Sequence, residues 1–314
     1  MVEDKIENNK MLNDLNSVRN NYDIFWLSEQ VKKKGDILNL SKNLNIERHV
    51  LDRAIKEAKM LSILPKMMRA KVTPLSTLKV SRERDLFLKE YDINKISCRE
   101  LYRIIKKWRI SLEKEPRILL TNEQHDLIIG STLGDANIRQ RDKNCSFRVG
   151  HSLKQKEYLY WKYNIFKEFT LSSPYLNKRS FNNRNVEIFN LDTFTHKVFN
   201  FYRKLFYKNG RKTITRELLN MLNPRSLAVW ICDDGSFCAK QRYIILCTNS
   251  YFLEEHKLIK EYFKDSWNLD PTIGFRDKKY YYLRFSKNDT KKLVEIIEPF
   301  VHNSMKYKVG KKNG

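Results

Sequence analysis

The sequence predicts an α+β protein in which one αββαββα unit occurs twice, preceded by a small all-α region. Two apolar runs of helical length each end in an aspartate, and these residues, Asp135 and Asp234, lie 99 positions apart (234 − 135). After each aspartate, strand-like and helical patterns follow in the same order. The 115 or so residues before the first run carry helical patterns at about 21–65, 82–90 and 97–110. These three observations predict two related units and an appended helical part.

The net charge is +24, from 61 basic and 37 acidic residues, which is typical of a protein that binds a polyanion. No apolar run approaches about twenty residues, so we expect no membrane partner and favour nucleic acid. A solvated basic surface is the alternative. The five cysteines form no CxxC pair, which argues against zinc and disulfide frameworks. We expect an intracellular protein, in a bacterial or phage-host cytoplasm or an organelle matrix.

The stretch from 36 to 56 has the pattern of a helix-turn-helix. A short helix, a tight turn near Asn45 and a second amphipathic helix follow one another. The second helix would expose Arg48, His49 and Arg53 toward a DNA major groove. An ordinary αα-hairpin is the alternative.

A second helical pair is predicted at 82–90 and 97–110. Ser97 and Glu100 form a capping-box pattern at the start of the later helix. One face of this helix is apolar, and the other is basic, with Arg99, Arg103, Lys106 and Lys107. The pair is either a second DNA-reading element or a basic linker, and the pattern leaves both open.

The helices that lead to the two aspartates carry small residues four positions apart on one face. These residues are Gly130 and Gly134 in the first helix, and Ala228 and Cys232 in the second. Small residues at this spacing allow two helix backbones to pack closely. Thr121 with Gln124 predicts a cap for the first helix, and Asn223-Pro224 predicts one for the second.

If these helices pack on one another, Asp135 and Asp234 lie side by side at the same end. Two adjacent carboxylates repel unless a cation lies between them, and Mg²⁺ with carboxylate and water ligands is the natural candidate. Asp233 would project about 100° away from its neighbour on a helix, as a support. The candidate metal site therefore comprises Asp135 and Asp234, with the adjacent Ala136 and Asp233.

The segments after each aspartate support the repeat. After the first come a strand around Phe147 and Val149 and then elements at 155–169, 186–191 and 194–206; after the second come elements at 243–247, 254–267, 279–285 and 289–300. Lys212 follows Asp135 by 77 positions (212 − 135), and Lys308 follows Asp234 by 74 (308 − 234). Each lysine is either a solvated cation or a group that stabilises charge on a phosphate or perturbs the attacking water.

Basic and aromatic side chains alternate along the predicted strands, which favours contacts with phosphates and base edges. The candidates are Arg139, Arg141, Arg148, Lys154, Arg179, Arg184, Arg242, Arg276, Lys278, Tyr282 and Arg284.

The residues around the two aspartates resemble the paired motifs of a LAGLIDADG homing endonuclease, in the single-chain, double-motif branch that includes intron-encoded enzymes. The resemblance covers about Thr121 to Val309 and rests on Gly130-Ser131-Thr132-Leu133-Gly134-Asp135-Ala136, Leu227-Ala228-Val229-Trp230-Ile231-Cys232-Asp233-Asp234-Gly235 and Met305-Lys306-Tyr307-Lys308. Ala136 and Val229 depart from the family pattern, and we expect Val229 to loosen or tilt the helix interface.

The resemblance implies a central interface of the two motif helices and two saddle-shaped sheets lying in the DNA major groove. Asp135 and Asp234 would bind the metal, with Lys212 and Lys308 at the active-site lysine positions. The implied reaction is hydrolysis of both strands of a long, specific double-stranded DNA site with 3′ overhangs. It would depend on Mg²⁺, with Mn²⁺ as a substitute.

We therefore expect a helical DNA-binding extension over residues 1–115, a first LAGLIDADG unit over 116–222 and a second over 223–314. The favoured function is a monomeric site-specific homing endonuclease. One alternative is an intron RNA maturase of the same fold, whose partner would be intron RNA. Another is a helix-turn-helix DNA-binding regulator.

Overall fold

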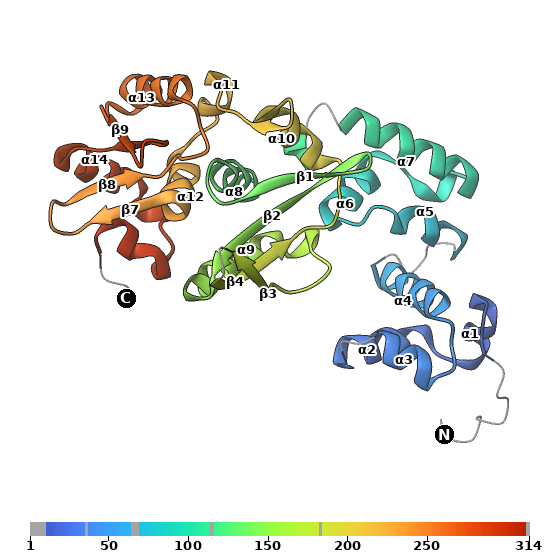
Figure 1. Ribbon diagram of the computed structural model, residues 1–314. Coiled ribbons are helices and arrows are strands. Elements are labelled where there is room, and N and C mark those ends of the chain that lie inside the picture. The colour runs from blue at the N-terminus through green and yellow to red at the C-terminus, as the bar shows by residue number, and fades with distance from the viewer. Residues whose placement is uncertain (1–10, 35–36, 64–68, 113–115, 182–183, 312–314) are drawn as a thin grey trace. The chain divides into compact units, whose positions relative to one another are not determined.

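A computed structural model describes residues 11–34, 37–63, 69–112, 116–181 and 184–311. The chain forms two compact units, 1–111 and 112–314 (Figure 1). Among the described residues, no helix is both long and apolar enough to span a bilayer.

The described elements of the N-terminal unit are helices, together with one isolated β-bridge between Leu12 and Ile46. Its elements are α1 (Leu15–Asn21), α2 (Ile24–Lys34), α3 (Ile37–Asn43), α4 (Arg48–Ile63), η1 (Arg69–Lys71), α5 (Val72–Ser76), α6 (Ser81–Glu90), η2 (Ile93–Lys95) and α7 (Cys98–Leu112). The predicted turn near Asn45 is confirmed, because this residue has a φ of 51° between α3 and α4. Val50, Leu51 and Ile55 of α4 are buried, as the apolar pattern predicted.

The second unit contains the repeat. Its first half comprises η3 (Pro116–Leu119), α8 (Asn122–Leu133), β1 (Asn137–Arg141), β2 (Asn144–Ser152), η4 (Leu153–Gln155), α9 (Lys156–Phe166), η5 (Lys167–Phe169), β3 (Tyr175–Phe181), β4 (Arg184–Asp192), α10 (Val198–Phe206), β5 (Tyr207–Lys208), β6 (Arg211–Lys212) and α11 (Arg216–Leu219). Its second half comprises α12 (Pro224–Asp234), β7 (Gly235–Cys238), β8 (Tyr243–Leu246), α13 (Leu253–Trp267), β9 (Thr272–Arg276), β10 (Tyr280–Arg284), α14 (Lys287–Ile297), η6 (Glu298–Phe300) and η7 (Asn303–Val309).

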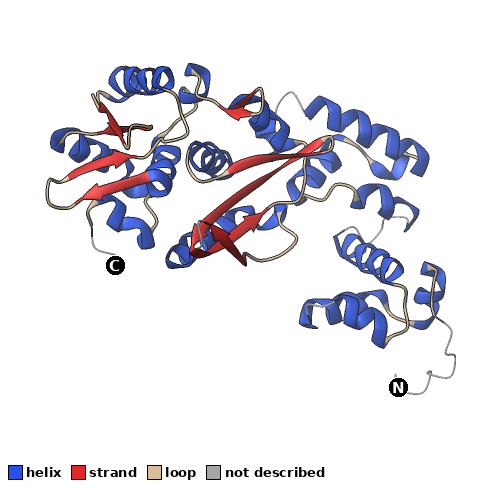
Figure 2. Ribbon diagram, in the orientation of Figure 1, coloured by secondary structure: helices blue, strands red, loops and turns tan. Residues whose placement is uncertain are grey.

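The two halves contain four-stranded antiparallel sheets of the same topology, β1-β2-β4-β3 and β7-β8-β10-β9 (Figure 2). The predicted α+β fold with two related αββαββα units is confirmed. The strand patterns located β2, β4, β8 and β10, and each pairs with an edge strand that the sequence did not locate individually. Helices α9 and α10 pack on the first sheet, and α13 and α14 pack on the second.

Helices α8 and α12 pack directly on each other at the centre of the second unit. A Cβ added to Gly130 would lie 2.3 Å from the carbonyl oxygen of Ser226 and 2.7 Å from Cβ of Val229. Only glycine fits this close contact. Val229 lies directly against Gly130, with its side chain in the space that the missing Cβ of this glycine leaves; whether it tilts the two helices stays a prediction.

Both predicted helix caps are confirmed as reciprocal capping boxes. Thr121 Oγ1 accepts from the Gln124 amide at 3.1 Å, and Asn223 Oδ1 accepts from the Ser226 amide at 3.0 Å. Asn223 also donates through Nδ2 to the buried Asp126 carboxylate of α8 at 2.7 Å. This hydrogen bond joins the start of α12 to α8 and fixes the axial register of the two helices.

Candidate active site

The packing of α8 and α12 brings Asp135 and Asp234 together. Asp135 lies two residues beyond the end of α8, and Asp234 is the last residue of α12. Between α8 and Asp135, Gly134 is in close contact with the end of α12: an added Cβ would lie 2.7 Å from Cβ of Asp233 and 3.5 Å from Cγ of Asp234. The small residue at this position therefore allows the two acids to approach.

The two carboxyl groups have different electrostatic environments. Burial, reinforced by the charges of Asp135 and Asp233, raises the pKa of Asp234 to about 8. Burial opposes ionisation of Asp135 as well, but contact with His151 and the charges of Lys162 and Lys308 leave its pKa below the usual value. The environment of Asp234 therefore favours its protonated form, whereas that of Asp135 favours the ionised form.

These residues fit a hard divalent cation. A cation shared by Asp135 and Asp234 would relieve the repulsion that raises the pKa of Asp234, and carboxylate oxygens are the donors that Mg²⁺ and Mn²⁺ prefer. Ala136 is buried and could offer only its carbonyl oxygen. Asp233 instead binds a buried ammonium group, described below.

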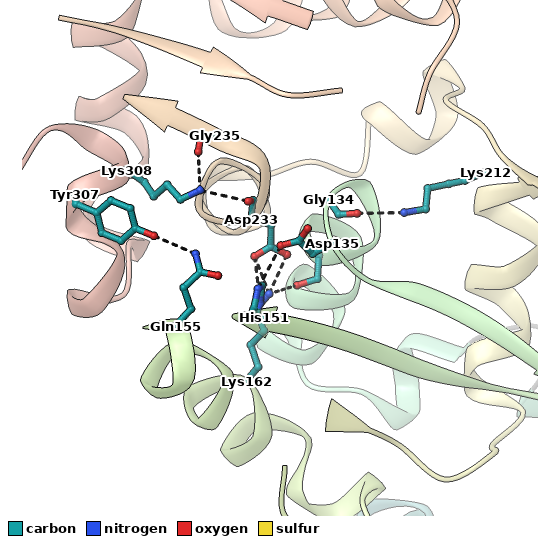
Figure 3. A network of polar contacts seen from close by, with 11 residues as sticks. Gly134, Asp135, His151, Gln155, Lys162, Lys212, Asp233, Gly235, Tyr307 and Lys308 are labelled. Atoms are coloured by element: carbon teal, nitrogen blue, oxygen red, sulfur yellow. Dashed lines mark hydrogen bonds and ion pairs between the residues drawn. The ribbon is translucent and has the colours of Figure 1, made fainter. Parts of the chain in front are cut away.

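Lys212 and Lys308 each bind backbone carbonyl oxygens next to one of the two acids, and Figure 3 shows Lys212 pointing to Gly134 and Lys308 pointing to Gly235 and Asp233. Lys212 Nζ donates to the carbonyl oxygens of Gly134 and Ala136, at 3.2 and 2.9 Å. Lys308 Nζ donates to those of Asp233 and Gly235, at 3.5 and 2.7 Å. Each lysine therefore binds the residues that flank one aspartate in the sequence. Burial lowers the pKa of Lys212, and the nearby carboxylates oppose that effect.

A buried ion pair joins the two motif helices to α9, and the sequence analysis missed it. Lys162 Nζ donates to both carboxylate oxygens of Asp233, at 2.8 and 2.9 Å, and to Ser131 Oγ at 2.7 Å. The side chains of both Lys162 and Asp233 are fully buried. The available signal was a single lysine within the aromatic run 158–166 of a predicted helix, which requires a buried acid as its partner.

His151 on β2 lies between the carboxylates of Asp135, which follows α8, and Asp233, which is in α12 (Figure 3). Its Nδ1 is 3.2 Å from Oδ2 of Asp135, and its Nε2 is 3.8 Å from Oδ1 of Asp233. Among the described residues, these three provide one cluster whose possible metal-ligand atoms lie within 4.8 Å of one another. His151 is thus placed to orient Asp135.

This arrangement is not repeated around Asp234. Asn137, two residues after Asp135, pairs with Arg148, and Ser236, two residues after Asp234, pairs with Ile245. His151 and Thr248 each follow three residues after these partners, so Thr248 occupies the position that corresponds to His151. Thr248 hydrogen-bonds instead to the buried His256, with 2.6 Å between Oγ1 and Nε2. The two halves therefore have the same fold but support their acids differently.

The strand registers place the predicted basic residues on one face of each sheet. In the first sheet this face holds the positions of Arg139, Arg141, Arg148, Arg179 and Arg184. In the second sheet it holds Arg276, Tyr282 and Arg284. The side chains of Arg179 and Arg184 lie outside the described part of the chain.

The remaining DNA-binding candidates lie in turns and on a helix. Lys154 is exposed in η4, and Arg242 and Lys278 are exposed in hairpin turns. In the N-terminal unit, Arg48, His49 and Arg53 are exposed on α4, although His49 lies 2.9 Å from a carboxylate oxygen of Glu47.

Comparisons with known proteins agree with this geometry. The probable intron-encoded endonuclease 1 of Wickerhamomyces canadensis is 29% identical, and the aligned region covers 60% of this chain and 85% of the relative's chain. The cytochrome b mRNA maturase bI2 of Debaryomyces hansenii is also 29% identical, over 61% of this chain and 75% of its own. The chain spans about half the length of further curated relatives named Protein RecA, from Mycobacterium shimoidei and Mycolicibacterium chitae.

Among solved structures, the homing endonuclease I-WcaI bound to its DNA recognition sequence aligns with a TM-score of 0.57 and 26% identity, over 65% of this chain and 93% of its own. Residues 125–293, more than half of the chain, match the LAGLIDADG DNA endonuclease family. The match includes both aspartates and the interface between their helices. The chain is therefore a member of the LAGLIDADG DNA endonuclease family.

Proposed function

We propose that this chain is a site-specific homing endonuclease that hydrolyses both strands of a long DNA target and leaves 3′ overhangs. The observation that carries the proposal is the close contact of α8 and α12, which puts Asp135 and Asp234 together at adjacent helix ends. Burial and the charges of Asp135 and Asp233 raise the pKa of Asp234, and a bound cation would counter that effect, which supports the proposal.

In this proposal Asp135 and Asp234 hold Mg²⁺, for which Mn²⁺ can substitute, and Ala136 would offer its carbonyl oxygen, which also accepts from Lys212 Nζ at 2.9 Å. The bound cation supplies Lewis-acid stabilisation of charge on the scissile phosphate. Lys212 and Lys308 fix the backbone on both sides of each acid, and their ammonium groups add positive charge near the phosphates. Asp233 is a support, because Lys162 neutralises it.

DNA would lie along the basic faces of the two sheets. Arg139, Arg141 and Arg148 on one sheet and Arg276 and Arg284 on the other present cations from strands separated by the motif helices. Two such faces suit a long site that is read by contacts with phosphates and base edges. Since one chain carries both faces, we propose that it acts as a monomer.

The N-terminal residues 1–115 would form an additional DNA-binding part, with Arg48, His49 and Arg53 of α4 as candidate contacts. Because the substrate is DNA, we propose an intracellular place of action, in a bacterial or phage-host cytoplasm or an organelle matrix.

A cleavage selection tests the proposal. The wild-type protein and the Asp135→Asn and Asp234→Asn variants are incubated with fragmented DNA of the native locus, in Mg²⁺ and separately in Ca²⁺, and all new ends are sequenced. We expect paired ends with 3′ overhangs only for the wild type in Mg²⁺. Cleavage that persists in either variant would refute the roles proposed for the two acids.

The second candidate is an intron RNA maturase. The similarity to a relative named as an mRNA maturase favours it almost as strongly as the similarity to a named endonuclease. Binding and splicing of intron RNA by a protein that yields no DNA ends would favour this function. A regulator that only binds DNA is less favoured, because it gives the paired carboxylates no role.

A further inference from the structure

We propose that helix α7 is a separate contact with duplex DNA, in addition to the contacts expected from α4 and the two sheets. The inference extends the DNA-binding part of the proposed function, and it concerns binding without cleavage. Four cations lie on the solvent side of α7: Arg99, Arg103, Lys106 and Lys107.

These cations belong to one continuous exposed stripe, which also contains one acid, Glu100, in the first turn of the helix. Tyr102 and Ile110 lie within the same stripe and are 46% and 57% exposed. The opposite side of α7 is buried through Leu101, Ile105 and Trp108. At about 1.5 Å per residue, the cations extend over about 12 Å of helix. The stripe therefore has a length comparable to the width of a B-DNA major groove, about 12 Å.

The buried side of α7 is firmly attached to its own unit. Arg109 forms an ion pair with the buried Glu83, with 2.9 Å between Nε and Oε1, and Trp108 Nε1 donates to Glu90 Oε2 at 2.7 Å. The ring of Trp108 packs edge-on against Phe87 at 5.1 Å. These contacts hold the backbone of α7 in place, so its outer side chains start from fixed positions, which lowers the entropic cost of binding.

The turn before α7 is also held in place. Lys71 is buried, and its Nζ donates to the carbonyl oxygens of Ile93 and Asn94, at 2.5 and 3.2 Å. Ser97 Oγ accepts from the Glu100 amide at 3.2 Å and caps the start of the helix. Helices α6 and α7 thus form a helical pair joined by a fixed turn.

The outer cations of α7 have no partners among the residues that the structure describes. Within that part of the chain, none of the four forms an ion pair or a side-chain hydrogen bond. On α4, Lys56 pairs with Asp52 and His49 lies beside Glu47, so the unpaired cations there are fewer. A group of unpaired cations on one helix face is the electrostatic arrangement expected for a polyanion.

Duplex DNA fits this face better than duplex RNA. A B-DNA major groove admits an α-helix, whereas the major groove of A-form RNA is too deep and narrow for side chains to read. Arg99, Arg103 and the two lysines would bind phosphates, and Tyr102 would contact sugar or base surfaces.

The test measures binding by the full-length protein to a mixed-sequence DNA duplex of about 30 base pairs in EDTA, by fluorescence anisotropy over a range of salt concentrations. One variant combines Arg103→Gln, Lys106→Gln and Lys107→Gln. A matched variant with the same charge change combines Lys89→Gln, Lys264→Gln and Lys287→Gln, which are exposed residues outside the stripe. Melting temperatures establish that both variants are folded.

We expect the α7 variant to have a shallower slope of log K against log salt. The slope should fall by about 0.9 for each phosphate that the variant no longer neutralises, and by about 2.7 if all three cations bind phosphates. The matched variant should keep the wild-type slope. An unchanged slope in the α7 variant, or equal reductions in both variants, would overturn the proposal, as would tighter binding of an RNA duplex through the same residues. The assay measures binding and no cleavage, so its result can be interpreted even if the nuclease proposal fails.

Discussion

Replacing Lys162 by methionine tests how the two motif helices are held together. The substitution keeps most of the apolar volume but leaves the Asp233 carboxylate in a fully buried position without the ammonium group that it binds at 2.8 and 2.9 Å. Removing one partner of a buried ion pair typically costs about 3–5 kcal/mol. In a folded unit the size of residues 112–314, this corresponds to a fall in melting temperature of about 6–20 °C.

The free energy of unfolding is measured by urea denaturation, and the melting temperature by calorimetry. The control is Lys257→Met in α13, because Lys257 Nζ lies 2.8 Å from Glu254 Oε1 but both side chains are more than half exposed. That exposed pair should contribute less than about 1 kcal/mol. The double variant Lys162→Met/Asp233→Asn, which removes both buried charges, should recover much of the loss in stability. Equal effects of Lys162→Met and Lys257→Met would refute the reasoning.

Three further predictions concern the interface, the acids and pH. Gly130→Ala should destabilise the second unit by about 1–3 kcal/mol, because its Cβ would meet a backbone oxygen at 2.3 Å; unchanged urea denaturation would contradict the close helix contact. His151→Gln should weaken Mn²⁺ binding about 10–100-fold, measured by electron paramagnetic resonance, because Asp135 loses its orienting neighbour, whereas Thr248→Ala should not. Burial lowers the pKa of His256 in the folded protein below its usual value of about 6.5. As the pH drops below about 6.5, the unfolded chain binds a proton at this residue more readily than the folded protein, so the free energy of unfolding should fall. His256→Gln should weaken this pH dependence, measured as the midpoint of urea denaturation.

The sequence predicted the repeat and its centre because both depend on local patterns. Glycines four positions apart and a capping residue before each apolar run are readable without any tertiary information, and they led to the interface between α8 and α12. The spacing of Lys212 after Asp135 left open a solvated cation or a group in the site, and in the structure its ammonium group binds the backbone around that acid.

The residues that the sequence analysis missed depend on contacts between distant segments. Lys162 is 71 positions from Asp233, and neither residue lies in a pattern that predicts the other. His151 alternates on a strand like any inward-facing residue, and only the tertiary fold brings its side chain to Asp135. The edge strands β1, β3, β7 and β9 are defined by pairing with their neighbours more than by their own composition.

Neutralisation of Asp233 by Lys162 distinguishes it from the two neighbouring acids, Asp135 and Asp234. Without Lys162, the carboxylates of Asp233, Asp234 and Asp135 would all contribute negative charge at the end of the motif helices, where the helix dipoles are also unfavourable to anions. Lys162 binds Asp233 from the buried side, and Lys212 and Lys308 bind the carbonyl oxygens that flank the other two acids. Of these three acids, Asp135 and Asp234 are the ones that no ammonium group binds directly among the described residues. The negative charge that no ammonium group binds directly therefore lies on Asp135 and Asp234, which occupy equivalent positions in the two halves. The proposed cation would bind there.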